Sequence, residues 1–265
     1  MTSPLLPLVR SVAREAGELA ATRRREGVQV AATKSSIVDV VTHADREVEV
    51  LIRERIAAAR PDDAILGEEG GTSGGTSGLT WVVDPIDGTV NYLYGIPHYA
   101  VSIAVVEGDP DPLTWTALAG VVLNPATGEE FAAARGEGAT CGTEPLRVAE
   151  PAPLERALVA TGFSYDAEFR GRQGEVVARL LPHVRDIRRG GTASLDLAGI
   201  AAGRLDGYYE RSLNPWDLAA GALIAEEAGA AVRGLGVPRP SRDFLIAGHP
   251  AVVDALEALL IELGA

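Results

Sequence analysis

The chain has 265 residues, of which 46% are apolar, and its 24 basic and 37 acidic side chains give a formal net charge of −13. This length and composition predict a globular protein with a sizeable core, built as one compact unit or as two fused halves. The acidic balance disfavours non-specific binding to nucleic acid or to an anionic membrane surface. An anionic substrate would therefore need local positive charge.

Cysteine usage and hydropathy bear on the compartment. Cys141 is the only cysteine, so no internal disulfide is possible and an oxidising compartment gains no support. The N-terminus lacks a basic segment followed by an apolar signal core, and no run reaches the roughly 18 apolar residues of a membrane helix. We therefore expect a cytoplasmic protein that does not contact a membrane.

The first 60 residues predict two helices. Apolar residues recur at helical spacing over residues 5–25, and Arg23-Arg24-Arg25 at the end complements the helix dipole. This basic triplet is more typical of a solvated helix terminus than of a nucleic-acid contact. After a strand near residues 28–32 and a loop, Thr42 is expected to cap a second helix that runs to about Arg60.

The middle of the chain predicts a largely antiparallel sheet. Apolar, β-branched runs separated by turns indicate strands over residues 64–66, 81–83, 99–106, 114–123 and 130–133. The Thr/Ser/Gly tract at residues 72–78 predicts a flexible, poorly ordered excursion.

Pro151 and Pro153 mark the expected boundary between an N-terminal α+β half, residues 1–150, and a C-terminal α/β half, residues 151–265. In the second half, strands and helices are expected to alternate. The predicted strands cover residues 157–161, 184–188, 206–210 and 244–247, and the predicted helices cover residues 173–183, a segment after Thr192, a segment from Pro215, and residues 251–263.

The stretch from Trp81 to Tyr92 is the strongest candidate for chemistry. Asp84 ends a buried strand, because Pro85 has no N–H to continue the ladder. Asp87, Gly88 and Thr89 then indicate a turn into a helix, where Gly88 lets a ligand approach the backbone. The start of a helix after such a turn is a typical binding site for an anion.

Taken alone, Asp84-Pro85-Ile86-Asp87 is typical of a simple turn. Two further acids favour a metal site: Glu68 follows the apolar run at residues 64–66, and Asp217 lies in the first turn of the helix from Pro215. Each pair of these four carboxylates, about 4 Å apart, would cost on the order of 4 kcal/mol, so the ionised cluster needs cations. Oxygen ligands without Cys or His favour Mg²⁺ over zinc.

Each candidate also has a purely structural interpretation, and the residues alone leave both open. Asp45 could be a first-turn acid in a near capping box with Thr42, and Asp217 could simply complement a helix dipole. Thr192 could be only a helix cap, Glu210 only a strand-end acid, and Lys34 only an exposed loop charge.

Three motifs resemble the signatures of the inositol monophosphatase family, namely Gly67-Glu68-Glu69, Asp84-Pro85-Ile86-Asp87-Gly88-Thr89 and Trp216-Asp217-Leu218-Ala219-Ala220-Gly221. Further similar motifs are Lys34-Ser35-Ser36, the segment from Asp39 to Asp45, Gly191-Thr192-Ala193 and Tyr208-Tyr209-Glu210. Each match alone is weak, but the set stands in family order and spans nearly the whole chain.

This resemblance implies a layered α-β-α-β-α sandwich and an Mg²⁺-dependent phosphatase with two or three ions in each active site. It places one ion on Glu68, Asp84 and the carbonyl of Ile86, a second on Asp84, Asp87 and Asp217, and a weaker third beside Glu68. The catalytic residues it implies are Glu68, Thr89 and Asp45, the last two orienting the attacking water.

The resemblance also assigns the substrate contacts. The N–H groups of Gly88 and Thr89 would bind the phosphate. The substrate's hydroxyl groups would be recognised by Gly191, Thr192, Ala193 and Glu210. Lys34 would lie on a mobile loop beside the metals. The expected substrate is a small polyol or sugar phosphate, foremost inositol 1-phosphate, because Val90 follows the pattern of inositol monophosphatases. The family also implies a homodimer and lithium sensitivity.

Two other functions remain open. The same machinery could act on fructose 1,6-bisphosphate, histidinol phosphate or 3′-phosphoadenosine nucleotides. Alternatively, the fold could serve as a non-enzymatic partner of the transcription or RNA-processing apparatus. The acidic balance weighs against direct contact with RNA in that case, but not against a protein partner.

Overall fold

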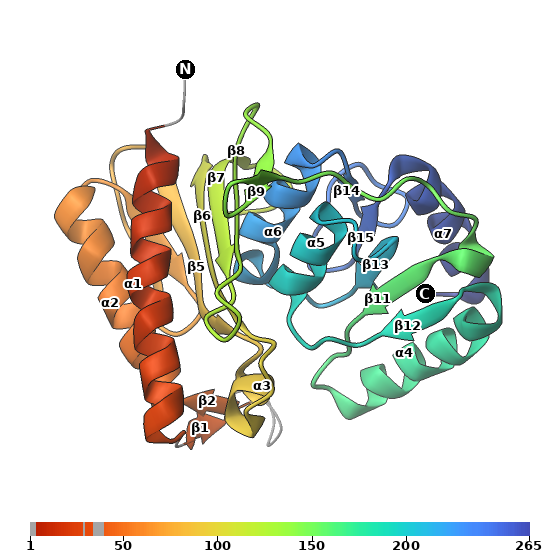
Figure 1. Ribbon diagram of the computed structural model, residues 1–265, viewed down its shortest axis with the longest axis horizontal. Coiled ribbons are helices and arrows are strands. Elements are labelled where there is room, and N and C mark those ends of the chain that lie inside the picture. Colours follow the sequence, from red (N-terminus) through yellow and green to blue (C-terminus); the bar gives the residue numbers. More distant parts are fainter. Residues whose placement is uncertain (1–3, 29, 34–39) are drawn as a thin grey trace.

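The computed structural model describes the chain except for residues 1–3, 29 and 34–39. Five layers, helices alternating with sheets, make up the described part (Figure 1). The helices are α1 (Leu5–Glu26), α2 (His43–Ala59), α3 (Thr89–Tyr94), α4 (Ala167–Leu180), α5 (Ala193–Ala201), α6 (Pro215–Glu227) and α7 (Pro250–Leu263). The layering confirms the expected sandwich.

The first sheet has eight strands in the order β10-β9-β8-β7-β6-β5-β3-β4, and its neighbours are antiparallel except for the parallel pair β3 and β5. Its strands are β3 (Ala64–Gly67), β4 (Gly71–Ser73), β5 (Leu79–Asp87), β6 (Ala100–Glu107), β7 (Thr116–Leu123), β8 (Glu130–Ala134), β9 (Ala139–Cys141) and β10 (Glu144–Pro145). A separate hairpin pairs β1 (Val30–Thr33) with β2 (Val40–Thr42).

The second sheet has five strands in the order β12-β11-β13-β15-β14, with a parallel part from β12 to β13 and an antiparallel part beyond it. Its strands are β11 (Leu158–Thr161), β12 (Asp186–Arg188), β13 (Gly207–Glu210), β14 (Ala231–Arg233) and β15 (Leu245–Gly248), and short 3-10 turns lie at Leu154–Arg156 and Leu181–His183. The antiparallel edge departs from the plain βα alternation that the sequence predicts.

Strand β6 shows how the core is divided. Val101, Ile103 and Val105 face α1 and α2, whereas Ala104 and Val106 face α5 and α6, because successive side chains of a strand point to opposite faces. The inner face is lined with small residues, which lets helix α6 approach closely. A third apolar cluster lies between the second sheet and helices α4 and α7.

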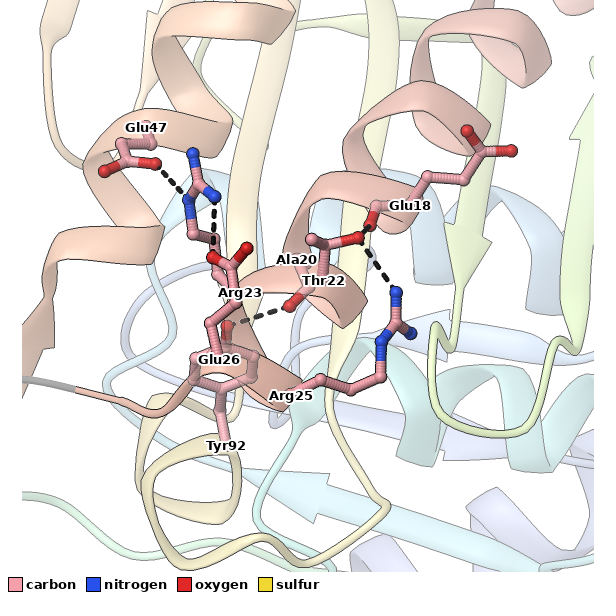
Figure 2. A network of polar contacts seen from close by, with 8 residues as sticks. All are labelled: Glu18, Ala20, Thr22, Arg23, Arg25, Glu26, Glu47 and Tyr92. Atoms are coloured by element: carbon pink, nitrogen blue, oxygen red, sulfur yellow. Dashed lines mark hydrogen bonds and ion pairs between the residues drawn. The ribbon is translucent and has the colours of Figure 1, made fainter.

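Contacts at the C-terminal end of α1 tie this helix to α2 and α3 (Figure 2). Arg23 donates from Nε to Glu47 at 2.5 Å and from Nη1 to Glu26 at 2.7 Å, and Tyr92 donates to the carbonyl of Ala20 at 2.8 Å. Arg23 is thus committed to ion pairs within the chain. Tyr92 fixes the position of α3, the short helix that follows the Asp84–Thr89 motif.

Two segments differ from the sequence-based expectation. The Thr/Ser/Gly tract is held in place: β4 pairs with β3, and the N–H groups of Thr76 and Ser77 donate to the carbonyl of Asp62. Helix α4 begins earlier than predicted, because Asp166 caps it by accepting a hydrogen bond from the N–H of Phe169 at 2.7 Å. None of the helices in the described residues is long and apolar enough to cross a bilayer.

Candidate active site

Strand β5 carries two acids to its C-terminal end. Asp84 pairs with Ser102 and Asp87 with Ala100, so the β5 strand has one extra residue, a bulge at Pro85 and Ile86. Asp84 and Asp87 are only 2% and 8% exposed. The strand therefore does not end at Asp84, as the sequence predicts, because pairing resumes at Asp87 beyond the bulge. The bulge leaves both carboxylates buried near the same strand end.

Gly88 makes the turn that follows, with a left-handed backbone (φ +89°) that glycine adopts without strain. A Cβ atom here would lie 2.7 Å from Cγ2 of Thr192, so the α3 and α5 segments approach too closely for any side chain. Helix α3 begins at Thr89, whose hydroxyl lies 3.0 Å from Oδ1 of Asp45 and 3.1 Å from the carbonyl of Ile86. That hydroxyl can donate to either oxygen.

Asp45 forms the capping box that the sequence indicates. Its Oδ2 accepts hydrogen bonds from the backbone N–H of Thr42, at 2.8 Å, and from the Thr42 hydroxyl. Burial raises the pKa of Asp45 to about 6, against the lowering effect of the Thr42 hydrogen bonds, and the charge of Glu68 adds to the rise. The structural interpretation of Asp45 is therefore correct, and the same carboxylate also contacts Thr89.

Glu68 follows β3, and its N–H donates to the carbonyl of Val83 on β5. The next turn is held by Glu49 of α2, a buried acid that accepts from the N–H groups of Glu69 and Gly70 at 2.7 and 2.8 Å. Sequence reasoning missed Glu49. The only sequence feature that could have identified Glu49 is the position of an acidic residue on the buried face of an amphipathic helix.

Asp217 lies in the first turn of α6 and accepts a hydrogen bond from the N–H of Asn214, the cap residue, at 2.6 Å. Its role at the start of the helix is thus as expected. The helix also brings the carboxylate to the same cavity as the β5 acids, although the two segments are far apart in the sequence.

These elements surround a cavity of 460 Å³. Its walls include nearly all the predicted site residues: Glu68, Asp84, Ile86, Asp87, Gly88, Thr89, Gly191, Thr192, Ala193, Glu210 and Asp217. Asp45 is not part of the wall and reaches it through Thr89. Lys34 lies outside the described residues.

The four carboxylates repel one another. The pKa of Asp84 is raised well above its usual value, first by burial and then by the charges of Glu68, Asp87 and Asp217. Burial and the charge of Asp87 likewise raise the pKa of Asp217. Helices α3, α5 and α6 all begin at this cavity, and their N-termini supply only part of the missing positive charge.

The donor atoms suit a hard divalent cation, because the described cavity wall contains carboxylates and a backbone carbonyl but no Cys or His. Within the described residues, no three Asp, Glu, His or Cys side chains stand together as a compact metal-binding group.

The start of α5 adds contacts that sequence reasoning missed. The N–H and hydroxyl groups of Ser194 both donate to Oδ2 of Asp87, at 2.8 and 2.5 Å. Nδ2 of Asn91 donates to the carbonyls of His98 and Gly190, at 2.7 and 2.9 Å, and so ties α3 to the loop before α5. Only the proximity of the two segments, invisible in sequence, could have identified these residues.

The far wall carries Glu210, which accepts a hydrogen bond from the Tyr208 hydroxyl at 2.7 Å. Burial raises the pKa of Glu210 to about 7, although the Tyr208 hydrogen bond and the charge of Arg189 oppose the rise. Arg189, Arg211 and Arg242 line the same cavity. The far wall therefore presents both a hydrogen-bond acceptor and positive charge to a ligand.

Comparison with known proteins identifies the family of the chain. Residues 1–258 match the sequence model of the inositol monophosphatase family, and the chain belongs to that family. It is 45% identical to "Inositol-1-monophosphatase SuhB" of Mycobacterium tuberculosis, over 90% of this chain and 83% of the relative. It is 37% identical to "Nus factor SuhB" of Escherichia coli, over 96% and 95%.

Among solved structures, the extragenic suppressor protein suhB of Bartonella henselae superposes with a TM-score of 0.88 at 36% identity, covering 97% of this chain and 98% of the other. The sandwich predicted from the sequence is thus the fold of the family. Phosphatase chemistry is what this family is named for.

Proposed function

We propose that the protein is an Mg²⁺-dependent phosphatase that hydrolyses a small polyol or sugar phosphate monoester, with inositol 1-phosphate as its foremost substrate. The observation that carries the proposal is the placement of Glu68, Asp84, Asp87 and Asp217, from three separate segments, around one cavity. Buried acids that raise one another's pKa are typical of sites that bind cations.

The roles proposed for the chain's own residues combine the family resemblance with their positions around the cavity. Glu68, Asp84, Asp87, Asp217 and the carbonyl of Ile86 would hold two or three Mg²⁺ ions. Bound Mg²⁺ supplies positive charge at the attacking and leaving oxygens of phosphoryl transfer. Thr89, held beside Asp45 at 3.0 Å, would orient the attacking water, because its hydroxyl can donate to one acceptor and accept from another group.

Substrate binding is assigned to two adjacent parts of the cavity wall, which meet where Gly88 approaches Thr192. The backbone N–H groups of Gly88 and Thr89, at the start of α3, would bind phosphate oxygens. Gly191, Thr192, Ala193 and Glu210 would contact the hydroxyl side, where Glu210 can accept hydrogen bonds from an alcohol.

The choice of inositol 1-phosphate is supported by the names of the mycobacterial relatives and by Val90 in the central motif. Phosphate release should be measured across inositol 1-phosphate, fructose 1,6-bisphosphate, histidinol phosphate and a 3′-phosphoadenosine nucleotide, with and without Mg²⁺. The proposal expects Mg²⁺-dependent turnover, fastest on inositol 1-phosphate. Faster turnover of another compound would reassign the substrate, and no turnover of any would reject the enzyme.

We further propose that the enzyme is a lithium-sensitive homodimer of the cytoplasm, as the family resemblance implies. Light scattering of the purified protein tests the dimer, and inhibition by LiCl but not by NaCl tests the sensitivity.

A second role, as a partner of the transcription or RNA-processing machinery, is favoured by one comparison: the E. coli relative is called a Nus factor. Affinity capture with wild type and with an inactive Asp87→Asn variant tests this role. If both proteins retain the same transcription components, the role does not depend on catalysis; if neither retains any, the role is rejected.

A further inference from the structure

A second cavity, of 270 Å³, lies between helix α4 and the five-stranded sheet. Phe169, Val176 and Val177 of α4 form one side, and Tyr209 and Phe244 lie on the sheet side. Helix α4 fully buries only Leu180 of its fourteen residues, so its apolar face stands off the sheet. The volume lies just below the roughly 300–1,000 Å³ typical of small-molecule sites, so the ligand must be small.

Two aromatic rings line the sheet side of this cavity. The rings of Tyr209 and Phe244 are stacked, with centroids 6.2 Å apart and planes 11° from parallel. A flat apolar body fits such a surface better than a branched one, because ring faces pack against ring faces.

The Tyr209 hydroxyl takes no part in the site. It is buried, and Tyr209 as a whole is only 6% exposed. Burial raises the pKa of this hydroxyl, and a hydrogen bond with Thr161 opposes the rise. The hydroxyl is therefore closed off from a ligand in the cavity, which would meet the aromatic ring of Tyr209 instead.

The mouth of the cavity carries positive charge. The guanidinium groups of Arg172 and Arg211 both lie over the ring of Phe169, 5.1 to 5.4 Å from its centroid. Arg211 donates to the carbonyl of Asp243, and in the described residues neither arginine has a carboxylate partner. Two unpaired cations held on one ring complement an anion.

The one acidic side chain in the described lining, Glu210, does not cancel this charge. Glu210 lines both cavities, but its carboxylate accepts from Tyr208 and lies against Gly162, where an added Cβ would be 2.0 Å from its oxygens. Gly162 belongs to the wall of the acid-lined cavity, so the charge of Glu210 is on that side.

We propose that this second cavity is a binding site for a small amphipathic anion, a flat apolar molecule with one negatively charged group. The apolar body would lie between Phe169 and the stacked rings, and the charged group would meet Arg172 and Arg211 at the mouth. The two cavities share Glu210 and Arg211 in their walls, but this site includes none of the four acids proposed to hold Mg²⁺ and does not rest on the phosphatase assignment.

Isothermal titration calorimetry with 2-naphthoate, without Mg²⁺ or substrate, tests the proposal. One saturable site is expected, with 2-naphthamide, the neutral counterpart, binding about tenfold more weakly. Arg172→Ala should weaken naphthoate binding about three- to tenfold, the range for loss of one charge at a rim. Arg188→Ala, at an exposed arginine outside the cavity, is the matched control and should change nothing.

Filling the cavity with Val176→Trp should abolish binding, and Asp87→Asn should leave it intact because Asp87 lines only the other cavity. If Val176→Trp fails to melt cooperatively, Arg172→Glu, at an exposed position, replaces it and should reduce binding more than Arg172→Ala. Absence of saturation, equal binding of naphthoate and naphthamide, or loss of binding in Asp87→Asn would each overturn the site.

Discussion

Ser194 donates two hydrogen bonds to a single oxygen of Asp87, one from its backbone N–H at 2.8 Å and one from its hydroxyl at 2.5 Å. This contact joins the start of α5 to the end of β5 across 107 residues of sequence. It fixes the orientation of the Asp87 carboxylate and stabilises its charged form, opposing the pKa rise that burial causes.

Replacing Ser194 with Ala should therefore weaken Mg²⁺ binding about tenfold, at the low end of the range for lost supporting hydrogen bonds, since the backbone N–H remains. The Mg²⁺ concentration for half-maximal activity should rise by the same factor. Ser194→Thr, which keeps the hydroxyl, is the control. Equal Mg²⁺ requirements in wild type and Ser194→Ala would show that the contact is only structural.

Asp87→Asn should nearly abolish turnover and leave the fold intact, because it removes charge from a group proposed to hold the cation that stabilises the transition state. Circular dichroism checks the fold and phosphate release checks the activity. Near-normal rates at saturating Mg²⁺ would refute the assignment of Asp87.

Glu49→Gln should destabilise the turn that carries Glu68. Its carboxylate accepts hydrogen bonds from the N–H groups of Glu69 and Gly70 and from Arg53. In glutamine an NH₂ group replaces one of the two acceptor oxygens, so one of these three donors would face another donor and lose its hydrogen bond. A loss of about 1–3 kcal/mol in the free energy of unfolding is expected, the cost of leaving a buried donor unpaired. Urea unfolding measures it, and Glu47→Gln, on the exposed side of α2, should change far less.

Asp63 gives a pH-dependent contribution to stability. Burial opposes its ionisation, but hydrogen bonds from Arg60, Ser77 and Trp81 outweigh burial and lower its pKa below 3.8. Because the folded-state pKa is depressed, the stabilisation is complete above the unfolded-state value and is lost as pH falls through the folded-state value.

Unfolding free energies of wild type and Asp63→Asn should consequently differ by a constant amount near neutral pH, with wild type the more stable. The difference should shrink below pH 3.8. A difference that stays unchanged down to the acid transition would mean that the ionised form of Asp63 contributes nothing.

Local signals in the sequence predicted most of the fold. The period of α1, the caps Thr42 and Asn214, and the apolar runs of β5 to β8 each depend on neighbouring residues alone, and each was predicted. The start of α4 was missed because the Asp166 cap precedes a segment with little apolar periodicity. The antiparallel edge of the second sheet depends on long-range pairing of β13 with β15, which no local pattern encodes.

For the candidate site, motif order identified the acids, and the structure places them on one cavity. It could not identify Glu49, Ser194 or Tyr209. These side chains act through partners that are distant in sequence, or line a cavity that exists only because α4 stands off the sheet. Such roles become visible only when the elements are packed together.

Thermal melting with and without Mg²⁺ shows whether Glu68, Asp84, Asp87 and Asp217 bind cations together. Bound cations offset the carboxylate repulsion only in the folded state, so Mg²⁺ at a hundredfold excess over its dissociation constant should add about 2.7 kcal/mol and raise the wild-type midpoint by several degrees. Asp84→Asn should be no less stable than wild type without metal, and should show a smaller shift with it. Equal shifts in both proteins, or none in either, would contradict the account.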